Sequence, residues 1–141
     1  MQAIRVVLFC FLFCGLQSVV SAQAQTFPEM LNLQTLIADQ EYENVLAKKI
    51  YSDSSVTAFV IWIKRDVPLH KHITHTEQIY VLEGTANISI GDVWMQISAG
   101  TWLIIPENTP HSVSVTSATP LKVLSIQAPE FDGTDRVIIK E

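Results

Sequence analysis

Residues 70–84, HKHITHTEQIYVLEG, place three of the chain's four histidines and a glutamate directly before an alternating apolar run. If the segment begins as a β-strand, His70 and His72 face the same side, because side chains two residues apart share a face. Glu77 opens the next apolar run, so a tight reversal after His72 brings its carboxylate opposite the two imidazoles. Two imidazoles and a carboxylate from neighbouring strands are a ligand set for a divalent transition metal.

The fourth histidine offers a further ligand. His111 follows the proline-bracketed turn IPENTP and starts the apolar run HSVSV. In a closed barrel, a strand distant in sequence can lie beside the strand of His70 and supply a third imidazole. The plainer alternative is that these are surface or turn histidines and that Glu77 is a solvated acid, but HxH with a spaced acid and a remote histidine seldom arises by accident.

His75 lies in the loop between the candidate ligands and is open to several interpretations. It could replace Glu77 as a ligand, act as a base behind the ligands, or be exposed to solvent. We favour exposure.

The rest of the chain is punctuated by short apolar runs that are rich in β-branched and aromatic residues. Turn-forming residues separate the runs, including RDVP and PEFDGTD, and IGDV at residues 90–93 is typical of a tight hairpin. This pattern predicts an all-β sandwich or small barrel with little helix. The expected strands are 45–51, 56–63, 78–82, 86–90, 93–97, 101–105, 112–115, 121–127 and 137–139.

The spacing of these residues resembles the two sequence motifs of the cupins. The first motif, Gly, five residues, HxH, three or four residues, Glu, six residues, Gly, is matched from His70 to Gly84, with Lys64 where the motif begins with glycine. The second is matched at Gly100, Pro106 and His111. It departs at two positions, which are Asn108 in place of glycine and Val115 in place of asparagine. Asparagine tolerates the left-handed backbone that a glycine would serve.

The resemblance implies a cupin double-stranded β-helix, that is, a jelly-roll barrel, with its motif region at residues 64–115. It also implies a metal site formed by His70, His72, Glu77 and His111. The expected cofactor is a divalent transition metal, with iron preferred and Mn, Ni, Zn or Cu as alternatives.

The N-terminus has the features of a secretory signal peptide. A positively charged start at Arg5 precedes the apolar run 6–16, and small residues then end at Ala22 or Ala24. We expect a signal peptide at residues 1–24, a single cupin domain at 25–141, and a periplasmic or secreted protein without a stable membrane span after cleavage. An uncleaved anchor is the alternative. Cys10 and Cys14 both lie in the apolar run, so the mature protein would have no cysteine.

Charge excludes one class of partner. Loss of Arg5 with the leader leaves 8 basic and 14 acidic residues, a formal charge of −6, and no large basic cluster is present. We therefore expect no nucleic acid partner.

The function that these features favour is an exported, metal-dependent, dioxygenase-like enzyme acting on a small molecule, in which Glu77 is both ligand and general base. The alternatives are a non-catalytic module that binds metal or a small ligand, and a cupin lyase or isomerase.

We expect the apolar side chains of Val81, Val113 and Val115 to line the pocket, and the aromatic side chains of Trp62, Tyr80, Trp94 and Trp102 to fill the core. A homodimer is expected, with the apolar arm at 31–37 covering a sheet edge of its own barrel or of its partner's.

Overall fold

The fold comes from a computed structural model that describes residues 30–140. The predicted signal peptide, residues 1–24, lies outside the described residues. From Leu31 onward the chain forms one compact unit. Within residues 30–140 there is no helix, and hence no apolar helix of membrane-spanning length.

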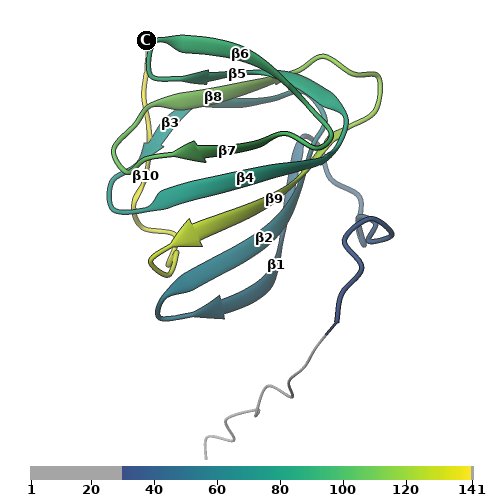
Figure 1. The fold of residues 1–141 in the computed structure, drawn as a ribbon, viewed down its shortest axis with the longest axis horizontal. Coiled ribbons are helices and arrows are strands. Elements are labelled where there is room, and N and C mark those ends of the chain that lie inside the picture. Colours follow the sequence, from purple (N-terminus) through teal and green to yellow (C-terminus); the bar gives the residue numbers. More distant parts are fainter. Residues whose placement is uncertain (1–29, 141) are drawn as a thin grey trace, which may run out of the picture. The chain divides into compact units, whose positions relative to one another are not determined.

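Ten strands form two five-stranded antiparallel sheets that face each other (Figure 1). One sheet has the order β1-β2-β9-β4-β7 and the other β10-β3-β8-β5-β6. The strands are β1 (Val45–Asp53), β2 (Val56–Ile63), β3 (Asp66–His72), β4 (Thr76–Glu83), β5 (Thr85–Ile90), β6 (Val93–Ser98), β7 (Trp102–Ile105), β8 (His111–Val115), β9 (Leu121–Ala128) and β10 (Arg136–Ile138).

Each of the nine predicted runs corresponds to a strand, and the strand considered for His70 and His72 is β3, which begins at Asp66. The turn predicted at RDVP is correct only for Arg65, which lies in the bend between β2 and β3, and wrong for Asp66 to Pro68, which belong to β3. Pro68 is tolerated there because the pairing of β3 with β8 shifts register between Val67 and His70, where no ladder hydrogen bond from residue 68 is needed.

Five described residues have a positive φ, and three of them explain particular turns. Gly91, with φ 55°, forms the predicted hairpin between Ile90 and Val93. Asn108 has φ 56°, so asparagine does adopt the left-handed backbone expected at this position. Gly84 has φ 85°, and a Cβ there would lie 3.0 Å from the Cα of Leu121, so both backbone and space require glycine.

The inward side chains of the two sheets form the main core. Its buried members are Ile63, Ile79, Val81, Ala86, Ile88, Ile97, Leu103, Ile105, Val113, Leu121 and Val123. Period-2 alternation explains this set, because one face of each strand is apolar.

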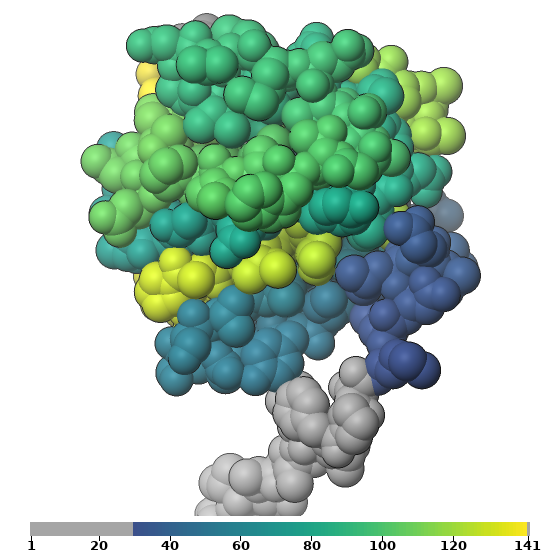
Figure 2. Space-filling view, in the orientation of Figure 1, coloured from purple at the N-terminus to yellow at the C-terminus, as the bar shows by residue number. Residues whose placement is uncertain are grey.

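A second apolar cluster lies on the outer face of the β1–β2 sheet, under the chain that precedes β1. Leu46, Val60, Trp62 and Leu82 are buried there, with Leu33 and Leu36 packed against them. Figure 2 shows this preceding segment, in dark blue, against the body of the barrel. The arm therefore covers a sheet face of its own barrel, where an edge was expected.

Lys122 on β9 fastens this arm. Its side chain is buried, and Nζ donates to the carbonyl oxygens of Leu33 (2.7 Å), Gln34 (3.3 Å) and Leu36 (2.6 Å). Three acceptors for one ammonium group satisfy its donors away from water.

The prediction that four aromatic side chains fill the core was right only for Trp62. Trp94 is 67% exposed, Trp102 57% and Tyr80 39%. The physical reason is alternation: Ile79 and Val81 face inward on β4, and Leu103 and Ile105 do so on β7, so Tyr80 and Trp102 must face outward. On β6 only Ile97 is buried, which leaves Trp94 at the surface.

Candidate metal centre

The structure brings the four predicted ligands together inside the barrel. His70 and His72 come from β3, His111 from β8 and Glu77 from β4, and all four side chains are buried. His70 pairs directly with His111 across the β3–β8 ladder, and their ring centroids are 4.1 Å apart. The ring of His72 lies 5.4 Å from that of His70 and 5.7 Å from that of His111. One ring nitrogen from each histidine lies within 4.8 Å of one from each of the others, so the cluster could hold a metal ion.

Hydrogen bonds fix the ring orientation of all three histidines. His70 Nδ1 faces the carbonyl oxygen of Pro68 at 2.8 Å, and His111 Nδ1 faces that of Thr109 at 2.9 Å. His72 Nδ1 faces the Asp135 carboxylate at 3.3 Å. Because carbonyl and carboxylate oxygens only accept, each Nδ1 carries the proton, and Nε2 of a neutral ring keeps a free lone pair. This is the tautomer that binds a metal through Nε2.

Glu77 presents one carboxylate oxygen to the histidines and has the other held from behind. Ser125 Oγ and Gln127 Nε2 both donate to Oε1. Oε2 lies 3.5 Å from His111 Nε2 and 3.9 Å from His72 Nε2. The carboxylate is thus oriented with Oε2 toward the space that the imidazoles share.

A divalent cation fits this donor set. Among the described residues, His111 Nε2 is one of two buried side-chain atoms without a hydrogen-bond partner, and it points at a carboxylate oxygen. An unpaired buried nitrogen costs free energy unless something binds it. Three imidazole nitrogens and a carboxylate oxygen match the preference of divalent transition metals.

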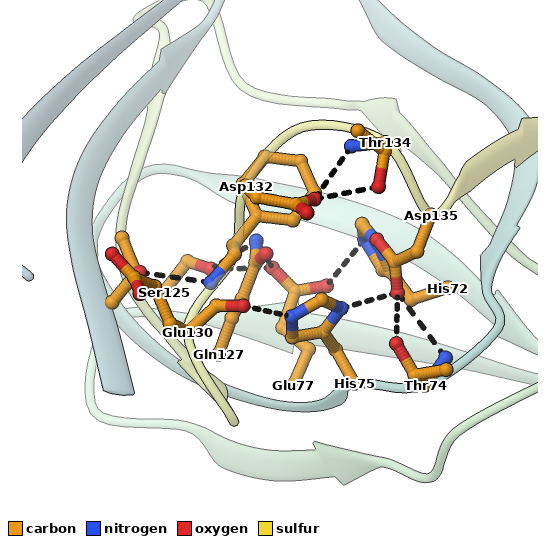
Figure 3. A network of polar contacts seen from close by, with 12 residues as sticks. His72, Thr74, His75, Glu77, Ser125, Gln127, Glu130, Asp132, Thr134 and Asp135 are labelled. Atoms are coloured by element: carbon orange, nitrogen blue, oxygen red, sulfur yellow. Dashed lines mark hydrogen bonds and ion pairs between the residues drawn. The ribbon is translucent and has the colours of Figure 1, made fainter. Parts of the chain in front are cut away.

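The prediction that His75 is exposed was wrong, because its side chain is buried. Figure 3 shows why: Nδ1 faces the Asp135 carboxylate, and Nε2 lies 2.6 Å from the carbonyl oxygen of Glu130. Both neighbours are acceptors, so both ring nitrogens donate and His75 is a buried imidazolium. In this arrangement neither ring nitrogen of His75 is free to bind a metal, although His72, His75 and Asp135 lie close enough together to hold an ion.

Asp135 connects this imidazolium to the metal cluster. Its Oδ1 accepts from His72, and its Oδ2 accepts from His75 and from the backbone N–H and hydroxyl of Thr74 (Figure 3). One carboxylate therefore orients a candidate metal ligand, neutralises a buried cation and closes the loop between β3 and β4.

The pKa shifts agree with these roles. Burial, with smaller contributions from the charges of His111 and Arg136, lowers the pKa of His70 to about 4. Burial also lowers the pKa of His72, although Glu77 and Asp135 oppose it. Both rings are therefore neutral near pH 7, as metal ligands must be. Burial opposes a charge on His75, but the Glu130 carbonyl and the Asp135 carboxylate outweigh burial and raise the pKa of this ring.

The two carboxylates remain ionised. Burial alone would raise the pKa of Glu77, but the nearby His111 and the Ser125 hydrogen bond lower it. Burial likewise opposes ionisation of Asp135, whose hydrogen bonds from His75 and Thr74 hold its pKa at about 2.

A cavity of about 330 Å³ opens beside the cluster. His70, His72, Glu77 and His111 line it together with Gln127 and Arg136, and the other walls are apolar or aromatic: Val45, Phe59, Ile61, Ile63, Val67, Pro68, Ile79, Val113, Val123 and Phe131. Val113 lines this cavity as predicted. Val81 and Val115 do not, because they pack in the core that fills the rest of the barrel.

Sequence reasoning missed the residues that support the ligands. Ser125 and Gln127 lie at alternate positions of an apolar run, LKVLSIQ, and a polar residue on the inward face of a strand is the signal that could have found them. Asp135 is the last residue of PEFDGTD, which was interpreted only as a turn, and Arg136 follows it directly. No local sequence pattern marks either residue as part of the site.

Comparison with known proteins finds a matching family model and several similar proteins. Residues 59–127 match the family model described as "Cupin domain". A Methanocaldococcus jannaschii protein described as uncharacterized is 32% identical over 72 residues, which is 51% of this chain and 58% of that protein. The match thus spans less than two thirds of this relative's length. An Aquifex aeolicus protein, also described as uncharacterized, is 25% identical over 114 residues, covering 79% of this chain and 93% of the relative.

Among solved structures, a Klebsiella pneumoniae protein with a double-stranded β-helix domain superposes with a TM-score of 0.66 at 14% identity, covering 79% of this chain and 97% of that one. At this identity the likeness shows the fold alone. The fold is therefore the double-stranded β-helix of the cupins, and the matches support placing the chain in the cupin superfamily. Within that class, this chain has a buried three-histidine cluster that could hold a metal ion.

Proposed function

We propose that the protein is an exported, metal-dependent cupin enzyme that acts on a small molecule, with dioxygenase-like chemistry as the first candidate. One observation carries the proposal: the buried His70, His72, Glu77 and His111 side chains line an apolar cavity. Its volume, about 330 Å³, lies within the range of small-molecule sites, and a metal site enclosed by the core would have no such space.

His70, His72 and His111 would hold the ion through Nε2, and Glu77 through Oε2. A divalent ion with open coordination positions supplies Lewis-acid activation of a bound molecule, and iron also supplies reaction with dioxygen. The apolar walls exclude water and position the body of the substrate. Glu77 lines the cavity, and when displaced from the ion its Oε2 would accept a proton from the substrate, while Ser125 and Gln127 keep its other oxygen in place.

The same parts would serve a lyase or isomerase that moves a proton on an enolisable acid. A non-catalytic binding module is the other alternative, and one observation favours it: within the described chain, Glu77 is the only carboxylate that lines the cavity. The open cavity supports binding of a small molecule in either case.

Metal analysis tests the proposal first. The purified mature protein should carry close to one equivalent of a transition metal, and His111→Gln and His70→Gln should each lose most of it. Lys71→Gln is the matched control, because Lys71 lies between the two histidines of β3 but bonds outward to Asn108. Equal metal content in all four proteins would contradict the proposed site.

Oxygen uptake then separates the candidate activities. Iron together with dioxygen consumption on flavonols, diketones or small thiols supports the dioxygenase. Tightly held zinc without turnover supports the binding module.

We also propose that residues 1–24 are removed on export to the periplasm or the medium, and that the mature protein is a homodimer. Mass spectrometry of the secreted protein tests cleavage, since the mature chain should begin at Gln23 or Gln25. An intact Met1 in the membrane fraction would indicate an anchor instead.

A further inference from the structure

Arg136 faces the metal cluster from the edge of its sheet. It lies in β10 directly opposite His72 of β3. Side chains of directly opposed residues in an antiparallel pair project to the same face, so Arg136 and His72 both point into the barrel. Arg136 accordingly lines the cavity, and part of the residue remains exposed to solvent, which places it at the cavity mouth.

The guanidinium interacts with the charge of Glu77 at longer range, but it has no hydrogen-bond or ion-pair partner within the described part of the chain. No hydrogen bond or ion pair joins it to residues 30–140, although acidic residues lie close by in sequence. Asp135 is engaged by His72, His75 and Thr74, and Asp132 accepts from the backbone and hydroxyl of Thr134 (Figure 3). Glu130 accepts from Ser52.

The remaining carboxylate near the cavity is already committed. Glu77 has one oxygen held by Ser125 and Gln127, and its other oxygen faces the histidines. The cavity is therefore lined by a cation that has no hydrogen-bond or ion-pair partner in the described chain, by apolar side chains and by the candidate metal-ligand atoms. This arrangement complements a molecule with an anionic group at one end and an apolar body.

We propose that Arg136 binds the carboxylate of the substrate, so that the substrate class is a small carboxylic acid with an apolar or aromatic body that extends from β10 toward the histidine cluster. A guanidinium presents two parallel N–H donors that match the two oxygens of a carboxylate. The proposal deepens the proposed function, and rests on it in taking this cavity as the substrate site.

Binding of a matched acid and amide tests this assignment. Isothermal titration calorimetry with 3-phenylpropanoate and with 3-phenylpropanamide compares a carboxylate with a neutral isostere on the same apolar body. Each probe is titrated into the mature protein as purified and again after removal of metal with a chelator. The variants are Arg136→Gln and Arg136→Lys. Arg65→Gln is the control, because Arg65 is an exposed arginine whose side chain, among residues 30–140, bonds only to Glu43.

The wild-type protein should prefer the acid, and Arg136→Gln should weaken acid binding by about tenfold to a hundredfold while leaving the amide unchanged. Arg136→Lys should retain part of the preference, since lysine keeps the charge without the fork. The preference should persist in the metal-free protein, so a failed metal site and a failed carboxylate site give different results. The proposal is overturned if acid and amide bind alike, or if acid binding survives Arg136→Gln but disappears on chelation, which would mean that the carboxylate binds the metal directly.

Discussion

Asp135 contacts two imidazoles that have opposite roles. Its Oδ1 accepts from His72, whose neutral ring could bind a metal, and its Oδ2 accepts from His75, whose two ring nitrogens both donate. A metal-binding histidine with a carboxylate behind it is oriented and made more basic. Because the same carboxylate neutralises a buried cation, a change at residue 135 affects both folding and the metal site.

Asp135→Asn should therefore lower both stability and metal affinity. It leaves the buried His75 imidazolium without a counter-charge, which should cost about 3 kcal/mol of unfolding free energy. It also weakens the support of His72, which should reduce metal affinity by about tenfold to a hundredfold. Urea denaturation and competition with a metal chelator measure the two effects.

The control is Asp132→Asn in the same loop, where the exposed carboxylate accepts only from Thr134 within the described chain. The interpretation of Asp135 is wrong if the two variants lose stability equally.

The low pKa of His70 predicts a pH dependence of the metal-free protein. Its folded-state pKa is about 4, against 6.5 for the unconstrained ring. Between these values the unfolded chain binds a proton that the folded chain does not, so stability falls as pH drops from 6.5 toward 4, by up to about 1.4 kcal/mol per pH unit for this one group. His75, with a raised pKa, acts in the opposite direction: its contribution is present below pH 6.5 and is lost as pH rises.

Thermal denaturation of the chelated protein across this pH range measures the effect. In His70→Gln, the change in unfolding free energy per pH unit should be smaller than in wild type by the amount that one proton contributes. The dependence that remains reflects His72 and other groups. Identical slopes for the two proteins would show that His70 does not titrate in this way.

At the scale of single elements, the arm before β1 depends on one buried lysine. Leu33 and Leu36 contribute apolar contacts to the outer cluster, while Lys122 satisfies their carbonyl groups. Apolar contact alone would leave these carbonyls without a donor at a half-buried position. The arm and β9 should therefore separate when the ammonium group is removed.

Lys122→Met should release the arm and destabilise the protein by about 2 kcal/mol, because charge-assisted hydrogen bonds are lost while the apolar stem is kept. Release should also expose Trp62, which shifts tryptophan emission to the red, and should make residues 31–42 sensitive to protease. Lys49→Met is the control, because Lys49 is an exposed lysine on β1, in the same sheet as Lys122. An arm equally protected in both variants would contradict this role of Lys122.

The elements that could be predicted from sequence are those with a local pattern. Alternation located the strands, and the spacing from His70 to Gly84 located three of the ligands. The beginning of β3 was missed because a proline such as Pro68 is rare within a strand, and the register shift that accommodates it depends on pairing with β8. The burial of His75 was missed for a similar reason: its partners, Glu130 and Asp135, lie 55 and 60 residues away.

At the scale of the whole molecule, the sheet order decides which residues meet. β10 pairs with β3, so the C-terminal segment lies beside the histidines, and this puts Asp135 and Arg136 at the site. This proximity follows from the pairing of two strands that are distant in sequence, and no local sequence pattern encodes it. The four candidate ligands could be predicted because all of them lie within the motif region, whereas the residues that support them and the proposed substrate anchor lie outside it and could not.

The outward face of β7 and β4 predicts how two copies of the protein associate. Tyr80 and Trp102 are direct cross-strand neighbours, and Ile104 faces outward on the same edge strand. Exposed aromatic and aliphatic side chains grouped at an unpaired sheet edge are typical of an interface between subunits.

We expect the mature protein to sediment as a dimer, and the double variant Trp102→Ser, Ile104→Ser to sediment as a monomer that keeps its fold by circular dichroism. Ile37→Ser is the control, because Ile37 is 76% exposed but lies on the arm. A monomer mass for the wild-type protein at every concentration would exclude the dimer. If the double variant still sediments as a dimer, the interface does not include this part of β7.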